Sequence, residues 1–131
     1  MNRVFVYGTL RKGFSNYDYY LTDSGYAGED EIVGYKMISM GSFPGIFYTG
    51  NINDIVHIEI YDVSDKTLKN LDILEGIPRL YKRFKIKSAA GNTGFIYTIS
   101  NEKIIDNCPV IKNGDWKKYT MNTDRRNYGN C

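Results

Sequence analysis

RVFVYGTLRKG, residues 3–13, joins a short apolar strand to a polar loop. Residues 3–7 are mostly apolar, which is typical of a strand buried inside a sheet. We expect the strand to stop at Gly8, so that the backbone N–H groups after it have no strand to pair with. Successive free N–H groups in a turn form a hollow that suits an anion or a developing oxyanion. Gly8 has no Cβ and allows a ligand close to the main chain, although a glycine that serves only the turn geometry is the alternative.

Outward from this segment, the sequence patterns predict mostly strands. Residues 55–63, IVHIEIYDV, alternate in the way of a strand with two distinct faces. Leu68, Leu71 and Leu74 recur at helical spacing across 66–75, and Gly76 ends that helix. Strands with one clear helix inserted between them predict an α+β domain built on a curled sheet or a small barrel. The other expected elements are a short helix over 16–21, one or two strands over 26–40 with a possible bulge at Gly34, a strand over 46–48, a hairpin of 81–88 with 93–100, a loop over 101–115 and a helical turn over 116–121.

Length and charge limit the class of protein. A chain of 131 residues predicts one domain, which we place at 1–121, followed by a polar tail over 122–131. The formal net charge of +2 is too small to indicate a nucleic-acid or membrane partner. No apolar stretch has the length of a signal peptide or of a transmembrane helix of ~20 residues. We therefore expect a soluble, cytoplasmic protein.

Residues that carry metal and nucleophile chemistry are scarce. His57 is the only histidine, and Cys108 and Cys131 lack the spacing of metal ligands. A zinc site, a Cys–His nucleophile pair and a Ser–His–Asp triad are therefore not expected. Neither of the common glycine-rich phosphate motifs, G-x-x-x-x-G-K-[ST] and G-x-G-x-x-G, occurs. The sequence predicts no metal site.

Glu75 is the candidate acid or base. It ends the run LDILEG at 71–76 and lies beside Leu71 and Leu74 in the helical pattern, which can direct it toward the protein. A carboxylate at the end of a helix also meets the negative end of the macrodipole. Burial and the dipole would both raise its pKa, and a general base works best when its pKa lies near the operating pH. A solvated glutamate in the last helical turn is the alternative interpretation.

Several short motifs occur in one order along the chain. The ordered set resembles the γ-glutamylcyclotransferase-like family, also called AIG2-like, over nearly the whole expected domain. YGTLRKG together with the later LEG and Y-x-R is most similar to the γ-glutamylamine cyclotransferase branch of that family. The motifs are YGTLRKG at 7–13, FPGI at 43–46, Glu59-Ile60-Tyr61, LDILEG at 71–76, Tyr81-Lys82-Arg83, the strand pair carrying Tyr97, and Gly114-Asp115-Trp116.

The resemblance implies a fold and a reaction. The fold is a small mixed β-barrel with flanking helices, and the reaction needs no cofactor. The α-amine of a γ-glutamyl compound attacks its own γ-carbonyl, a five-membered ring closes to 5-oxoproline, and the attached amine or amino acid leaves. The only partner that this implies is the small γ-glutamyl substrate, bound by a monomer or a homodimer.

The resemblance also implies site residues. Glu75 takes the position of the acid/base, and the loop that binds the glutamyl head group corresponds to Tyr7, Gly8, Thr9 and Leu10. The physical argument agrees with this, since well-oriented intramolecular attack can reach effective molarities of about 10⁵ M or more. One carboxyl group can carry the proton from the attacking amine to the leaving amine.

Three more residues are candidates for substrate binding. Tyr81 and Arg83 lie on one face of their expected strand, shortly after Glu75, and can position Glu75 or contact the substrate. For Arg83 the alternative is a solvated basic strand face. Tyr97 is either a pocket hydroxyl or an ordinary core aromatic residue.

Two other functions stay open. The first is a non-catalytic module on the same fold, which recognises a small acidic metabolite or a partner's side chain and is stabilised by ligand without forming product. The second is a nucleic-acid-binding β-barrel that uses tyrosines and the lysines of 82–87, with strongly salt-dependent binding to single strands. The near-neutral net charge argues against the second.

Overall fold

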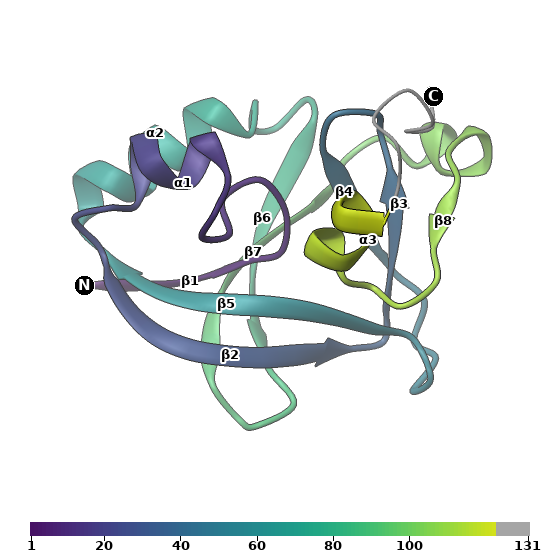
Figure 1. The fold of residues 1–131 in the computed structure, drawn as a ribbon, viewed down its shortest axis with the longest axis horizontal. Coiled ribbons are helices and arrows are strands. Elements are labelled where there is room, and N and C mark those ends of the chain that lie inside the picture. The colour runs from purple at the N-terminus through teal and green to yellow at the C-terminus, as the bar shows by residue number, and fades with distance from the viewer. Residues whose placement is uncertain (123–131) are drawn as a thin grey trace.

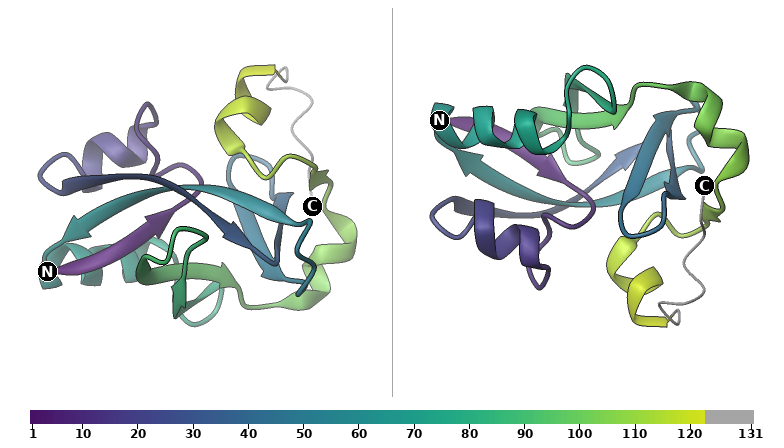
Figure 2. Two further views of the ribbon diagram at one scale, coloured as in Figure 1. Left: turned by 90° about the horizontal axis from the view of Figure 1, so that it is seen from below. Right: turned by 90° about the horizontal axis from the view of Figure 1, so that it is seen from above.

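The computed structural model describes residues 1–122, which form an α+β domain of two sheets and short helices (Figure 1 and Figure 2). Residues 123–131, and with them Cys131 and nearly all of the expected polar tail, lie outside the described residues. The elements in chain order are β1 (Asn2–Val6), α1 (Ser15–Tyr20), β2 (Gly25–Val33), β3 (Tyr35–Ser39), β4 (Pro44–Tyr48), β5 (Ile55–Val63), α2 (Asp65–Leu74), β6 (Tyr81–Lys87), β7 (Thr93–Ile99), the 3₁₀ helix η1 (Glu102–Asn107), β8 (Val110–Ile111) and α3 (Trp116–Asn122).

Strand β1 lies at the centre of the larger sheet, as its apolar sequence predicts. That sheet has the strand order β2-β5-β1-β7-β6, with β1 antiparallel to β5 and parallel to β7. Val4 and Val6 pack into one hydrophobic cluster, and Phe5 packs into the other on the opposite face. Because neighbours cover both edges and both faces of β1, the segment that follows Val6 leaves the sheet from its interior.

The predicted barrel does not close. Within the described residues, β2 and β6 are the two edges of the five-stranded sheet, and a separate three-stranded sheet has the order β4-β3-β8. The chain passes from β2 to β3 through Gly34, which has a φ of 90° that L-residues other than glycine rarely adopt. Gly34 is therefore a corner between the two sheets. The irregularity in strand pairing lies earlier, between Tyr26 and Gly28, and not at Gly34.

Helix α2 brings Glu75 to the interior side of the domain. Its N-cap is Ser64, whose Oγ accepts a hydrogen bond from the Thr67 N–H, and Leu71 is fully buried. The helix ends at Glu75, whose N–H still bonds to the Leu71 carbonyl, and Gly76 with a φ of 62° turns the chain away. In Figure 1, α1 and α2 lie together over one end of the larger sheet.

Two short elements occur where the sequence predicts a loop. The segment 101–115 contains η1 and the two-residue strand β8, which pairs with Met37 and Ile38 of β3. A two-residue strand has no alternation to detect, because a period of two needs several residues to become visible. Among the described residues, the helices are too short and too polar to cross a membrane.

Candidate functional site

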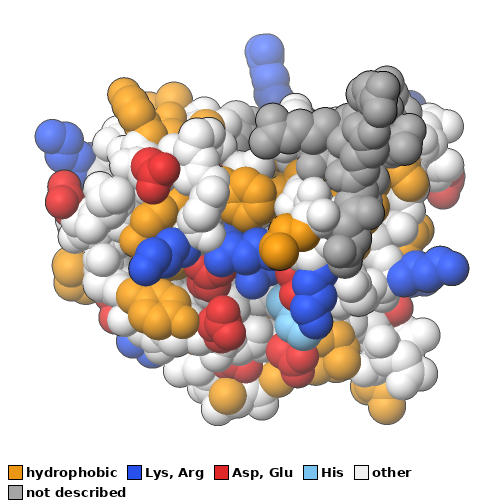
Figure 3. Space-filling view, in the orientation of Figure 1, with side chains coloured by type: hydrophobic (Ala, Val, Ile, Leu, Met, Phe, Trp, Pro, Cys, Tyr) orange, Lys and Arg blue, Asp and Glu red, His pale blue; other side chains and the backbone are white. Residues whose placement is uncertain are grey.

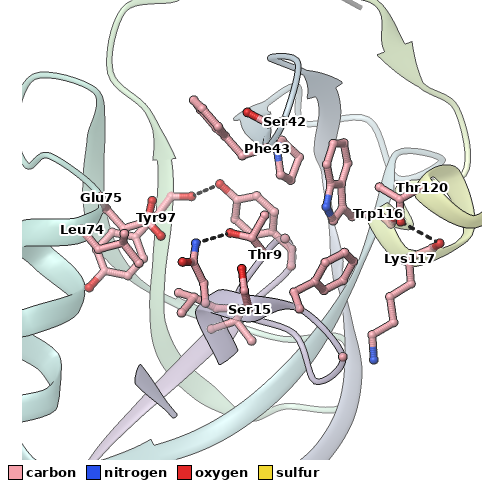
Figure 4. A pocket seen from close by; sticks show the side chains of 18 of the residues that line it. Thr9, Ser15, Ser42, Phe43, Leu74, Glu75, Tyr97, Trp116, Lys117 and Thr120 are labelled. Atoms are coloured by element: carbon pink, nitrogen blue, oxygen red, sulfur yellow. Dashed lines mark hydrogen bonds between the residues drawn. The ribbon is translucent and has the colours of Figure 1, made fainter. Parts of the chain in front are cut away.

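A pocket of about 1040 Å³ lies where the loop after β1, the turn after β3, the end of α2 and helix α3 meet (Figure 4). Seven of the eight residues predicted for the site line this pocket. They are Tyr7, Gly8, Thr9, Leu10, Glu75, Tyr81 and Tyr97. Residues as far apart in the chain as Tyr7 and Tyr97, which are 90 positions apart, are thus brought to one pocket.

The loop after β1 carries free backbone N–H groups, as the sequence predicts. The Arg11 N–H donates to the Gly8 carbonyl at 3.0 Å, which folds residues 8–11 into a turn. Within the described part of the chain, the N–H groups of Gly8, Thr9 and Leu10 donate to no backbone or side-chain acceptor. All three residues line the pocket, so this turn is able to receive an anionic group.

Gly8 has a further structural reason to be glycine. A Cβ at this position would lie 2.7 Å from Cγ and 2.8 Å from Cδ of Pro44. The space beside the Gly8 Cα is therefore filled by the turn that precedes β4, not left open for a ligand. The close approach joins two walls of the pocket, since Pro44 also lines it.

Replacing Gly8 by alanine is expected to destabilise the protein by about 1–3 kcal/mol, because the added methyl group overpacks against the Pro44 ring. Gly25→Ala is the matched control, since the nearest atoms to its new Cβ, in Asp62, are 3.9 Å away. Urea denaturation of the two variants measures the difference. Equal stabilities would show that the contact of Gly8 with Pro44 does not constrain the loop.

Arg11 anchors the loop through a buried ion-pair network. Only 5% of Arg11 is exposed, and its Nε donates to Glu59 Oε2 at 2.9 Å. Its Nη1 donates to Asp115 Oδ1, also at 2.9 Å, just before α3. The guanidinium group therefore ties the loop to β5 on one side and to the start of α3 on the other.

Glu59 is the centre of this network. The Lys12 N–H and the Tyr61 hydroxyl donate to Glu59 Oε1 at 2.9 Å and 2.8 Å, and Lys117 Nζ lies 2.9 Å from Oε2. Burial alone would raise the pKa of the Glu59 carboxyl, but these hydrogen bonds, with that of Arg11, outweigh it and hold the pKa below its usual value. Glu59 is thus a fully partnered anion. The sequence pattern placed it on a strand face and gave no sign of this role.

Glu75 has a different environment. Its side chain lines the pocket, and within residues 1–122 its carboxyl has no hydrogen bond or ion pair. Burial raises the pKa of Glu75 to about 7. Burial is one of the two causes expected from the sequence. Glu75 is half-buried, its carboxyl group has no partner among the described residues, and its pKa lies near 7. Such a group is able both to take and to give a proton near pH 7.

Three tyrosine hydroxyls surround this end of the pocket. The pKa values of Tyr7, Tyr81 and Tyr97 are all raised, by burial first and in smaller part by the nearby charge of Glu75. Tyr7 donates to the Tyr97 carbonyl at 2.6 Å, and Tyr81 donates to the Pro44 carbonyl at 2.6 Å. The hydroxyl groups stay protonated and join the pocket walls to one another.

Arg83 is the predicted site residue that does not line the pocket. Its Nη1 bonds to Asp72 Oδ2 at 2.8 Å, and its guanidinium lies over the Phe95 ring at 4.7 Å. The other oxygen of Asp72 accepts the Tyr97 hydroxyl at 2.8 Å. Arg83 is therefore connected to the pocket through Asp72 and Tyr97. Its position does not predict a direct contact with a ligand in the pocket.

The far end of the pocket lies at α3. Figure 4 shows Glu75 and Leu74 at one end, Thr9 between, and Trp116, Lys117 and Thr120 at the other. The sequence indicated Trp116 only through the motif Gly114-Asp115-Trp116, and no local signal placed Lys117 at a pocket. Among the described residues, no three His, Cys, Asp or Glu side chains gather in a way that could hold a metal ion.

The sequence was compared with known proteins and protein families. The profile of the family described as "Gamma-glutamyl cyclotransferase, AIG2-like" matches residues 4–118. A Methanocaldococcus jannaschii protein, which its name assigns only provisionally as a gamma-glutamylcyclotransferase, is 34% identical over 124 residues, or 91% of this chain and 98% of that protein. The gamma-L-glutamyl-butirosin B gamma-glutamyl cyclotransferase of Niallia circulans is 29% identical over 130 residues, or 92% of this chain and 79% of that protein.

A solved structure shares the fold. The crystal structure of an AIG2-like protein from Mus musculus superimposes with a TM-score of 0.74 and covers 86% of each chain, at 24% sequence identity. The likeness supports the arrangement of two open sheets with flanking helices described above.

Proposed function

Because the chain belongs to the γ-glutamyl cyclotransferase, AIG2-like family, we propose that it is an enzyme that releases 5-oxoproline and an amine or amino acid from a small γ-glutamyl compound. The observation that carries the proposal is that Glu75 and the free N–H groups of residues 8–10 lie around one pocket. The first supplies a proton acceptor and the second an anion site. These are the two groups that an intramolecular aminolysis of an amide requires.

Glu75 carries the protons in this mechanism. The α-ammonium of the substrate gives one proton to the Glu75 carboxylate and attacks the γ-carbonyl carbon as a free amine. As the original C–N bond breaks, Glu75 gives this proton to the leaving nitrogen. The ring nitrogen then gives its second proton to the Glu75 carboxylate, which passes it to the leaving amine as that amine departs as an ammonium ion. Two protons leave one nitrogen and two reach the other, so Glu75 ends as it began.

The loop after β1 holds the negative charges of the substrate. The N–H groups of Gly8, Thr9 and Leu10 bind the α-carboxylate or steady the oxyanion that forms on the γ-carbonyl oxygen. Tyr7, Tyr81 and Tyr97 form walls that fold the glutamyl chain so that its nitrogen reaches its own carbonyl carbon. This folding is the main requirement, because attack within one molecule has a high effective molarity. In this scheme Arg83 positions Tyr97 through Asp72.

The charges on the face shown in Figure 3 favour a small ligand over a nucleic acid there. The face seen in Figure 3 carries acidic, basic and hydrophobic side chains close together around its centre, where α3 crosses the strands, with no continuous basic surface outside the grey atoms. A strand of nucleic acid would need such a basic surface to neutralise its phosphates.

The proposal is tested by incubating the protein with γ-glutamyl dipeptides and with γ-glutamyl-ε-lysine and by assaying for 5-oxoproline. Release of 5-oxoproline from at least one of these compounds is the expected result. Thermal stabilisation by the compounds without any product would contradict it and would support a binding module on the same fold.

The pH dependence of kcat/KM is expected to follow Glu75. The base is active as the carboxylate, which exists above its pKa of about 7. The rate should therefore rise about tenfold per pH unit below that value and level off above it. Initial rates between about pH 5 and about pH 9 give the profile. A rate that stays flat or falls as the pH rises through 7 would contradict the role of Glu75.

A further inference from the structure

The pocket extends well beyond the space that a glutamyl head group needs. If the head group lies between Glu75 and residues 8–10, the attached group points along the pocket toward α3, past the turn that contains Phe43 (Figure 4). The side chains at that end therefore select what is attached to the γ-glutamyl group.

The walls of this far end are largely aromatic. Phe14 follows the loop after β1, Phe43 lies in the turn before β4, and Trp116 begins α3, and all three line the pocket. Phe14 and Phe43 are half-buried, so each presents part of its ring to the pocket. Trp116 is held from behind by stacking on Tyr119, with ring centroids 5.5 Å apart. Such walls favour an apolar or aromatic substituent, at about fourfold in affinity for each CH₂ group buried.

Among the described residues that line the pocket, basic side chains outnumber acidic ones. Glu75 is the only acidic residue among the described residues that line it, whereas Lys12 and Lys117 both line it. Lys117 is paired with Glu59, but within residues 1–122 the Lys12 ammonium group has no ion pair. Because Lys12 is exposed, it lies at the rim.

The carboxylates nearest this end are not available to a second cation. Glu59 already accepts hydrogen bonds at both oxygens, from Arg11, Lys117, Tyr61 and the Lys12 N–H. Asp115 is bonded to Arg11. A leaving group with an ammonium of its own would therefore meet two lysines and no free carboxylate, while one with a carboxylate would meet Lys12.

We propose, on the premise of the cyclotransferase function above, that the group released is an apolar or aromatic α-amino acid, whose side chain lies among Phe14, Phe43 and Trp116 and whose carboxylate lies near Lys12. The bond that breaks is the amide between the γ-carbonyl and the nitrogen of this amino acid. The bond that forms joins the γ-carbonyl to the α-nitrogen of the glutamyl group. No oxidant, reductant or second substrate takes part.

The test compares three substrates by kcat/KM, with 5-oxoproline as the readout. They are γ-glutamyl-phenylalanine, γ-glutamyl-alanine and γ-glutamyl-putrescine, which differ in apolar size and in the charge of the leaving group. The phenylalanine compound is expected to exceed the alanine compound by about tenfold or more, and the putrescine compound to be the poorest. A preference for the putrescine compound would overturn the inference, and so would equal rates for all three.

Charge reversal at Lys12 gives a second readout. Lys12→Glu is expected to lower the ratio of kcat/KM for the phenylalanine compound over the putrescine compound by about tenfold, since it repels the carboxylate and attracts the ammonium. Lys36→Glu is the matched control, because it makes the same charge change on β3 at an exposed position that does not line the pocket. An unchanged ratio in Lys12→Glu, or an equal change in Lys36→Glu, would overturn the role of Lys12.

The two proposals fail in different ways. Release of 5-oxoproline with the opposite substrate ranking overturns only the inference about the leaving group. Absence of 5-oxoproline from all three compounds and from γ-glutamyl-ε-lysine overturns the cyclotransferase function. In that case, thermal shifts with the same compounds still measure the preference of the pocket, and equal shifts for the phenylalanine and putrescine compounds would overturn the inference as well.

Discussion

Glu75→Gln is expected to lower kcat for the release of 5-oxoproline by about 10²–10⁴-fold while the fold persists. The glutamine has nearly the shape of glutamate but cannot take the proton from the α-ammonium or return it to the leaving nitrogen. Glu29→Gln, at an exposed position on β2, is the control for loss of a carboxylate elsewhere. This variant should release 5-oxoproline with the same kcat as the unchanged protein. Full turnover in Glu75→Gln would remove Glu75 from the mechanism.

The same substitution is expected to stabilise the fold above neutral pH. Burial raises the pKa of Glu75 to about 7 in the folded chain, so the folded protein binds this proton more tightly than the unfolded chain does. The stability that Glu75 contributes is therefore complete below its unfolded pKa of about 4.3 and is lost as the pH rises through 7. Glu75→Gln should then gain roughly 1–3 kcal/mol over the unchanged protein at pH 8, but nothing at pH 4. Urea denaturation at the two pH values gives the comparison, and a loss of stability at pH 8 would contradict this environment for Glu75.

Arg11→Met is expected to destabilise the protein by about 3–5 kcal/mol. The substitution keeps an unbranched side chain but leaves Glu59, which is 2% exposed, and Asp115, which is 7% exposed, without their shared guanidinium. Lys117 remains beside Glu59, and no described side chain replaces Arg11 at its bond to Asp115 Oδ1. Chemical denaturation near pH 7 measures the loss.

Arg3→Met provides the matched control for Arg11→Met. Arg3 pairs with Asp62 at 2.9 Å, but both side chains are about one-third exposed, and solvent screens a pair of this kind. Its replacement is expected to cost far less than that of Arg11. Similar losses in the two variants would show that the buried network does not hold the loop after β1 in place.

The sequence predicted the elements whose residues follow a clear period. The strand over 55–63 is β5 with the same bounds, and the helix over 66–75 is α2 to within one residue at each end. The apolar run before Gly8 identified a central strand, because only a strand covered on both faces is apolar throughout. The prediction of a small barrel was wrong in that the sheet does not close. Closure depends on which strands pair across the corner at Gly34, and this pairing does not change the alternation of apolar and polar residues within either strand.

The candidate site was predicted in part. Glu75 and the residues from Tyr7 to Leu10 lie at the ends of regular elements, so their placement at one pocket follows from the ends of α2 and β1 meeting. Arg83 was expected at the same site, but its guanidinium group is bonded to Asp72 on α2 instead. No pattern in the sequence near either residue indicates that pair. The contribution of α3 to the pocket was not predicted, since the position of α3 depends on contacts of Arg11 with Asp115 across more than a hundred residues.

Product identity tests the central claim most directly. The protein is incubated with a γ-glutamyl dipeptide labelled with ¹⁵N at the glutamyl α-nitrogen, and the products are separated and weighed by mass spectrometry. The mechanism predicts equal amounts of free amino acid and 5-oxoproline, with the label in the 5-oxoproline ring. Release of labelled glutamate, which is the product of attack by water, would contradict cyclisation by the substrate's own amine.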